Sequence, residues 1–356
     1  MNPDKRALRE LPAPQYSQEE REKIIQYFMD LKGDLIREFL SNQNLPKSGT
    51  KPELKELIEE YLDEGQIKYS DLVNLLDSVI PFGKQHIFLL NGPEAEIDKW
   101  RDSSYVKTLL DKNNVSQYLN ARLPLILPEA LSLSWIEYER ARFINIYAVE
   151  RRDHWERQDE YDERKQLEDV EIELRAYSHQ VTRGVVIFGW DLVSNTATLQ
   201  ISQLASGSRY EEVEDRFADL VKQWLDLASF QKLDLRPVIG KLQKSEESGN
   251  GETRSHGIGY RSLGGRSMWV QSPSHHDSIL GEEYINNALR IFRRKGIGHG
   301  GNFYWLPASL NPANGNPLEK EVHTVIVANK QRINFTTPNN KDDIEYVLSR
   351  VRALGK

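Results

Sequence analysis

The sequence predicts an α+β fold, in which a small helical region precedes a larger domain built on a mostly antiparallel sheet. Two observations support this prediction. Apolar side chains in the first 80 residues recur at spacings of three and four, as they do on one face of a helix. Beyond Trp135 the apolar period changes to two, with short turns between strands and helices between some of them. Such a mixture is typical of α+β domains.

The N-terminal region, residues 1–80, is expected to be helical. Ser17 and Glu20 have the spacing of a capping box, in which a serine hydroxyl and a glutamate carboxylate accept backbone N–H groups at a helix start. A second helix is predicted over 33–41, inside a helix pair that continues past residue 50. Ser70 is expected to cap a further helix.

Residues 81–135 are expected to connect this region to the sheet domain. The spacing of their apolar residues indicates helices or strands less clearly than in the rest of the chain. A strand is predicted at 85–90, where the apolar run ends at Asn91-Gly92-Pro93. Mixed helical character follows over 106–119. No known module is assigned to the connection.

Residues 136–356 are assigned to the α+β domain. A segment rich in serine, glycine and charge, 244–256, is expected to be a flexible loop within it. The predicted strands are 143–149, 170–176, 185–192, 196–202, 267–271, 302–306, 322–328 and 331–336, and the predicted helices are 213–224, 278–295 and one around 344–351.

Composition excludes several classes of protein. The 356 residues are 38% hydrophobic and 28% charged, with a mean hydropathy of −0.62. The sequence has no cysteine, and this excludes disulfides and cysteine-ligated metals. The apolar runs are far shorter than the roughly 20 residues of a membrane span, and the N-terminus lacks a secretory signal. We expect an intracellular, cytoplasmic protein without a membrane partner, nucleoid-associated if bacterial and nuclear if eukaryotic.

The net charge of −7 argues against a surface that is basic everywhere. A local basic site is still compatible with it, because exposed charges are screened beyond about 8 Å at physiological salt. The positions of the lysines and arginines therefore matter more than their number.

One segment carries a specific motif. Residues 35–62 read LIREFLSNQNLPKSGTKPELKELIEEYL and resemble the SAP module, a short helix–extended–helix unit, over about 31–66. Thr50 and Glu53 have capping-box spacing before the second helix. Gly49 permits backbone conformations that a Cβ would hinder. Asn44 stands where the family usually has glycine, and asparagine tolerates the left-handed conformation better than most residues.

The resemblance implies DNA binding, with duplex favoured over single-stranded DNA. A helix N-terminus offers free N–H groups and the positive end of its dipole to phosphate. Residues 31–66 contain five basic and eight acidic residues, but most of the acidic residues lie toward the end of the second helix. A helix pair for protein contacts is the alternative. The expected DNA-binding residues are Arg37, Lys47, Ser48, Gly49, Thr50, Lys51 and Lys55.

A second candidate anion site lies in a glycine- and arginine-rich stretch. Residues 251–301 hold ten of the 22 glycines, and arginine forks with glycine-rich backbone can hold phosphate. The alternative is structural, since cations and glycine both favour a helix C-terminus. A P-loop is not indicated. The candidate residues are Arg261, Arg266, Arg293, Arg294, Lys295 and His299.

Other charged segments carry weaker signals. His275-His276-Asp277 is compact, but a solvated loop is favoured over a metal site. Residues 150–175 hold eleven acids and six bases, typical of a long solvated hairpin or helix face, with an acidic edge for a basic partner as the alternative. Asp169, Glu171 and Glu173 could hold Mg²⁺, but they lack the lysine of a metal-nuclease core. No metal site or cofactor is predicted.

The sequence therefore predicts a DNA-associated protein, in which a SAP-like module tethers a larger binding or scaffold domain to DNA. Genome maintenance or defence against foreign DNA would suit such a combination. The first alternative is an enzyme acting on nucleic acid or nucleotide, with its phosphate site at 254–301. A second is a protein-interaction adaptor that does not bind DNA. No catalytic residue is assigned, which favours a non-enzymatic role.

Overall fold

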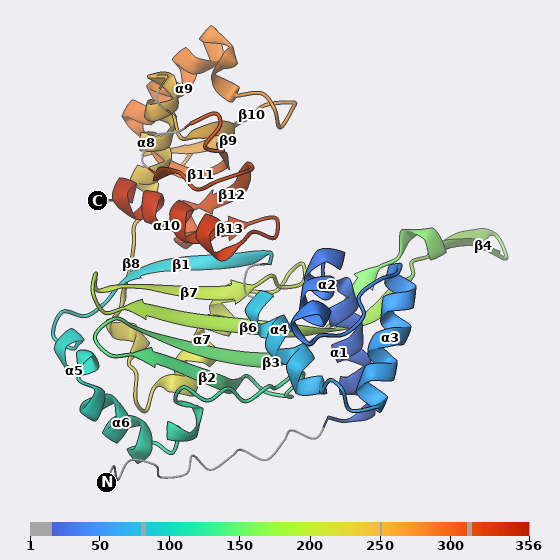
Figure 1. The fold of residues 1–356 in the computed structure, drawn as a ribbon. Coiled ribbons are helices and arrows are strands. Elements are labelled where there is room, and N and C mark those ends of the chain that lie inside the picture. Colours follow the sequence, from blue (N-terminus) through green and yellow to red (C-terminus); the bar gives the residue numbers. More distant parts are fainter. Residues whose placement is uncertain (1–15, 80–82, 250, 312–314, 356) are drawn as a thin grey trace.

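A single long sheet runs through the molecule, with helices packed against both of its faces (Figure 1). The computed structural model describes residues 16–79, 83–249, 251–311 and 315–355. Neighbouring named strands are antiparallel throughout the sheet. The predicted α+β fold with a mostly antiparallel sheet is therefore confirmed.

Eleven strands form this sheet within the described residues. They are β1 (Gln85–Asn91), β2 (Ser132–Glu139), β3 (Phe143–Arg157), β6 (Tyr177–Asp191), β7 (Thr196–Ser202), β8 (Gln231–Lys232), β9 (Thr253–Ser262), β10 (Ser267–Gln271), β11 (Gly296–Trp305), β12 (Val322–Val327) and β13 (Arg332–Phe335). Their order is β10-β9-β11-β12-β13-β1-β7-β6-β3-β2, and the short strand β8 also pairs with β1.

In the described part of the chain, four α-helices precede the sheet and six lie within or after it. The N-terminal helices are α1 (Gln18–Asp30), α2 (Gly33–Asn42), α3 (Lys51–Asp63) and α4 (Tyr69–Val79). The others are α5 (Ile97–Arg101), α6 (Ser103–Lys112), α7 (Tyr210–Val221), α8 (Arg236–Glu247), α9 (Glu283–Lys295) and α10 (Lys341–Gly355). Among the described helices, none combines the length and apolar character that crossing a membrane requires.

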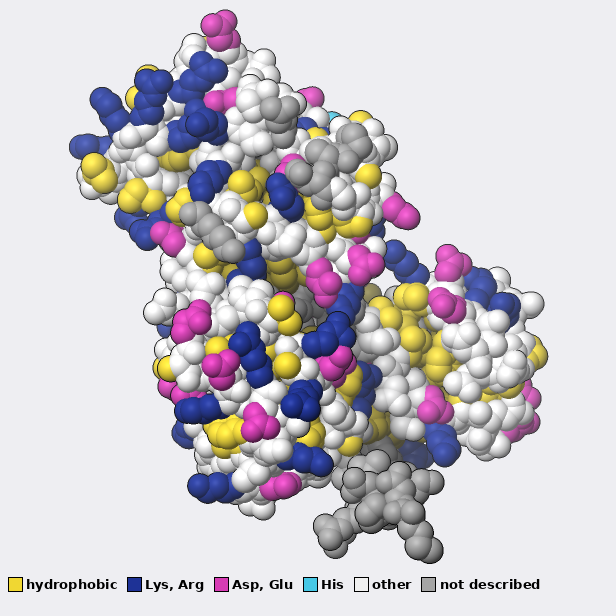
Figure 2. Space-filling model, turned by 60° about the vertical axis from the view of Figure 1, so that its left-hand side comes forward, with side chains coloured by type: hydrophobic (Ala, Val, Ile, Leu, Met, Phe, Trp, Pro, Cys, Tyr) yellow, Lys and Arg dark blue, Asp and Glu magenta, His cyan; other side chains and the backbone are white. Residues whose placement is uncertain are grey.

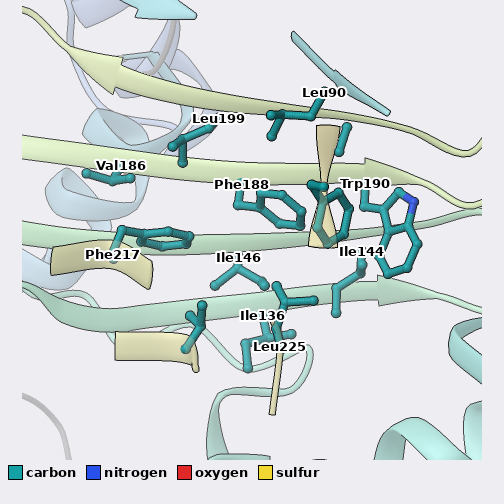
Figure 3. Packing of buried hydrophobic residues seen from close by; sticks show 14 of the residues in the cluster. Leu90, Ile136, Ile144, Ile146, Val186, Phe188, Trp190, Leu199, Phe217 and Leu225 are labelled. Atoms are coloured by element: carbon teal, nitrogen blue, oxygen red, sulfur yellow. The ribbon is translucent and has the colours of Figure 1, made fainter. Parts of the chain in front are cut away.

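Strand β1 joins two hydrophobic cores on opposite faces of the sheet. Phe88 and Leu90 belong to a core with α5, α6 and α7, part of which is drawn in Figure 3. Ile87 and Leu89 belong to a second core with α8, α9 and α10. Successive side chains of a strand point to opposite faces, so one strand serves both cores. The segment 81–135, expected to be a connection, thus supplies the middle strand of the sheet.

The N-terminal helices form a module with its own core, built around Phe28, Leu40 and Ile58. Ile126 and Leu127, from the segment that leads to β2, complete that core. The Tyr27 hydroxyl donates a hydrogen bond to the Val181 carbonyl on β6, at 3.0 Å. The module is therefore packed against the sheet domain (Figure 1).

Strands β3 and β6 extend beyond the sheet and carry a projecting hairpin of β4 (Glu163–Leu167) and β5 (Val170–Leu174) (Figure 1). Every residue of β4 is exposed. We call residues 155–179 the arm. The solvated hairpin predicted from the charge of 150–175 is present here.

Some boundaries differ from the prediction. The prediction of a loop over 244–256 is wrong at both boundaries, because α8 runs through Glu247 and β9 begins at Thr253. Burial of Val238, Ile239 and Leu242 holds α8 as a helix. Glu246 and Glu247, at its end, are held by hydrogen bonds to residues of other elements. Helix α4 begins one residue before Ser70, the expected cap. Residues 1–15 of the expected helical region lie outside the described residues.

Candidate nucleic-acid interface

The link between α2 and α3 has the backbone geometry that the sequence predicted. Asn44 adopts a left-handed conformation, with φ of 58°, directly after α2. Gly49 has φ of 135°, which an L side chain rarely adopts. Helix α3 then begins at Lys51. Residues 43–50 are therefore an extended, mostly exposed link between two packed helices.

A carboxylate occupies the start of α3. Glu53 accepts hydrogen bonds from the Thr50 N–H at 2.7 Å and from the Thr50 hydroxyl at 2.9 Å. The backbone hydrogen bond, and then the hydroxyl, hold the pKa of the Glu53 carboxyl below its usual value. The cap predicted from Thr50 and Glu53 thus also places a negative charge where a phosphate would approach the helix dipole.

Two lysines beside the link keep their charge uncompensated. The Lys47 ammonium donates to the Ser41 hydroxyl at 3.0 Å, and the Lys51 ammonium donates to the Met29 carbonyl at 2.8 Å. Both acceptors are neutral, and neither lysine forms an ion pair with any residue that the structure describes. Both side chains are exposed. They can therefore contact an anion without first breaking a salt bridge.

The flanking cations differ from these lysines. Arg37 donates to the Gly49 carbonyl at 3.1 Å, which brings its guanidinium against the link, and lies 3.7 Å from the Asp34 carboxylate. Lys55 lies 3.7 Å from Glu59, on the acidic part of α3. The structure thus gathers Arg37, Lys47 and Lys51 around the link and directs Lys55 elsewhere. Ser48, Gly49 and Thr50 are exposed between them.

The second candidate site is divided among several elements. Arg261 ends β9, Arg266 lies in the turn before β10, and His299 lies within β11. Arg293 is bound to Glu247 of α8 by hydrogen bonds of 2.8 and 3.0 Å. Arg261, Arg266, Arg294 and Lys295 form no ion pair within the described part of the chain. These residues make a basic surface rather than one converging pocket.

The glycines of this stretch have a packing role. A Cβ at Gly298 would lie 2.8 Å from the Arg236 carbonyl oxygen, and one at Gly301 would lie 2.5 Å from the Phe303 ring. A Cβ at Gly259 would lie 2.5 Å from Trp269. These glycines are in β9 and β11, whose backbones pair with each other. Close packing therefore accounts for much of the glycine content that suggested an anion site.

A cleft of about 870 Å³, which the sequence did not indicate, lies over the sheet between α4 and α10. Its floor includes Glu137, Asn145 and Tyr147, and the Glu137 carboxylate accepts a hydrogen bond from Asn145 at 2.9 Å. Four acidic and four basic side chains line it, so it has no net charge to attract a phosphate backbone. The charged lining residues are Asp77, Glu137, Asp191, Glu345, Arg122, Arg142, Lys341 and Arg352.

The residues that gave weaker signals in the sequence lie at exposed positions. His275 and His276 lie in a turn after β10, and Asp169 and Glu171 lie at the tip of the arm. No three histidine, aspartate or glutamate side chains are grouped to hold a metal ion in the ranges that the structure describes.

A search of protein-family models and of curated proteins found no match to this chain. The likeness of 31–66 to the SAP module therefore rests on the residues named above.

Proposed function

We propose that the chain binds DNA, duplex in preference to single strands, through the link between α2 and α3, beside Lys47 and Lys51. The observation that carries this proposal is that both ammonium groups are exposed and lack a carboxylate partner among the described residues. Phosphate contacts from lysine supply most of the affinity of sequence-independent binding. Few such contacts give weak binding that falls with salt.

The helical module is packed against the sheet domain, and this restricts where bound DNA would lie. Asp77 on α4 and Arg183 on β6 form a buried ion pair at 2.6 Å, and Leu127 lies in the core of the module. DNA held at the link would therefore be held at a constant position relative to the sheet domain. We propose that the sheet domain is a binding or scaffold domain that acts beside DNA, as genome maintenance or defence against foreign DNA would require.

The test is fluorescence anisotropy with labelled duplex and single-stranded DNA over a range of salt concentrations. The variant is Lys47→Gln/Lys51→Gln, because glutamine removes the charge but keeps an N–H donor for the Met29 carbonyl. Lys23→Gln/Lys68→Gln is the control, since it removes the same charge from one half-buried and one exposed position elsewhere in the module. We expect the first variant alone to bind more weakly, with a salt slope smaller by about 2.

The same measurement separates the alternatives. An enzyme with its phosphate site at 254–301 would lose affinity when Arg294 and Lys295 are changed, and not when Lys47 and Lys51 are. An adaptor would bind neither form of DNA at low salt. Either result would reject the proposed role of the link.

A further inference from the structure

The arm has an apolar face that nothing in the described chain covers. The β4–β5 pairing places Leu167 opposite Val170, and Ile172 and Leu174 on the same face. The exposed fractions of Leu167, Val170 and Leu174 are 63%, 61% and 44%. A two-stranded hairpin is marginally stable alone. A partner that covers this face would therefore both bury apolar surface and stabilise the arm.

The arm is also acidic, and this restricts the partner. Residues 155–179 contain nine acidic and four basic side chains. Arg157, Lys165 and Arg175 are paired with carboxylates of the arm itself. Acidic groups of the arm without an ion pair in the described chain are Glu156, Glu160, Glu168, Asp169 and Glu171. Glu171 lies on the face opposite Leu167 and Val170, and the ion pair Glu163–Lys165 lies on the same face as these apolar residues. Glu168 and Asp169 form the turn next to Leu167 and Val170. The complementary surface must therefore place basic side chains at the end of an apolar face, where it meets this turn.

The outer face of α9 has this composition. Tyr284 and Ile291 are 70% and 59% exposed and lie seven residues apart, hence on one face of the helix. Arg294 and Lys295 follow Ile291 by three and four residues, so they extend the same face. Both are exposed and form no ion pair with a described side chain. Figure 2 shows lysines and arginines gathered at the top of the molecule, where α8 and α9 lie.

The two surfaces also agree in length. Five residues of a strand span about 17 Å. The eleven steps from Tyr284 to Lys295 also span about 17 Å along a helix. Figure 1 shows α9 at the top of the molecule and the arm projecting to the right, far from α9, so the arm of one chain does not reach its own α9. A contact between these surfaces therefore joins two molecules.

We propose that the chain associates head to tail, with the apolar face of one arm packed on the outer face of α9 of a second copy. Pairing of two arms would bring like charges together, whereas arm-to-helix contact brings opposite charges together. A heterologous contact leaves one free arm and one free α9 at the ends of each complex. Such contacts build rings or filaments. Because the surfaces are small, we expect association to depend strongly on concentration.

Sedimentation velocity of the full chain, without DNA, tests this proposal separately from DNA binding. The arm variant is Leu167→Lys/Leu174→Lys, and the helix variant is Ile291→Glu/Arg294→Glu. Val193→Lys, at an exposed turn, is the control. We expect wild type and control to associate as concentration rises and salt falls, and each variant to stay monomeric. An equimolar mixture of the two variants should form a dimer and no larger species, because one intact surface remains on each.

Several results would overturn the proposal. Wild type could remain monomeric at its highest soluble concentration. The helix variant could associate like wild type while the arm variant does not, which would assign the contact to two arms. The helix variant could lose DNA binding with unchanged association, which would make α9 a nucleic-acid surface. Circular dichroism melts establish that the variants are folded, and the changed side chains lie outside the cores.

Discussion

The carboxylate of Asp77 on α4 lies 2.6 Å from the guanidinium of Arg183 on β6, and their side chains are only 11% and 1% exposed. Arg183 also donates to the Leu125 carbonyl at 2.8 Å. A buried charge that loses its partner is costly. The pair therefore ties the stability of the helical module to that of the sheet.

Removing one member of this pair should lower the free energy of unfolding more than replacing both members with apolar residues. We expect Asp77→Ala to lower the free energy of unfolding by about 3–5 kcal/mol, because Arg183 is left buried and unpaired. Asp77→Leu/Arg183→Met should lose less. Urea unfolding of Asp77→Leu, Arg183→Met and their double variant measures the coupling. Additive losses would show that the two groups stabilise the protein independently.

Glu53 should oppose DNA binding while it caps α3. Its carboxylate lies at the helix N-terminus, so Glu53→Gln removes a charge that repels phosphate. We expect affinity for duplex DNA to rise about two- to fivefold at low salt, and less at high salt. Anisotropy titration checks this, with Glu64→Gln near the other end of the helix as the control. Weaker binding by Glu53→Gln would contradict the proposed position of the phosphate.

His86 should make stability sensitive to acid. Its ring is buried and lies 3.9 Å from the Tyr210 ring. Burial, followed by the positive charge of Arg332, lowers the pKa of His86 to about 4. The unfolded chain takes up this proton near pH 6.5, whereas the folded chain does not. The stabilisation is therefore present above pH 6.5 and is lost as the pH falls toward 4.

His86→Phe tests this effect, because phenylalanine keeps an aromatic ring but cannot be protonated. We expect the unfolding free energy of wild type, relative to the variant, to fall by about 3 kcal/mol between pH 7 and pH 4. Urea unfolding at both values measures it. A constant difference across this range would mean that His86 is not held neutral in the folded chain.

The glycines of β11 should matter for packing. A Cβ at Gly298 meets the backbone oxygen of Arg236 and lies 3.0 Å from the Ile239 Cβ, so neither neighbour can easily move away. We expect Gly298→Ala to destabilise the protein by about 1–3 kcal/mol. At Gly281 nothing lies within 4 Å of the added carbon, and Gly281→Ala is the matched control. Equal melting temperatures for the two variants would contradict the packing role.

Local patterns predicted the elements whose causes are local. The Ser17 hydroxyl and the Glu20 carboxylate form the expected reciprocal cap at the start of α1. The strands predicted over 185–192 and 196–202 also form and pair as a hairpin, with Asn195 at φ of 53° in the turn between them. In both cases residues close in sequence make the deciding contacts.

Features that depend on distant segments were not predictable in this way. The glycines of 251–301 suggested an anion site, because the sequence does not show that Trp269 packs on Gly257 and Gly259 or that α8 packs on Gly298. The cleft between α4 and α10 joins side chains from both ends of the chain. The free charges of Lys47 and Lys51 could be expected, but the carbonyl that binds Lys51 could not.

The central position of β1 has a consequence for how the protein is made. Ile87 pairs with Gln200 on one side and with Ile333, near the C-terminus, on the other. During synthesis one edge of β1 stays without its β13 partner until Arg332–Phe335 have emerged, and an unpaired strand edge invites aggregation. Contacts this far apart in sequence also slow folding. Truncation before β13 should therefore yield an aggregation-prone product rather than a smaller stable protein.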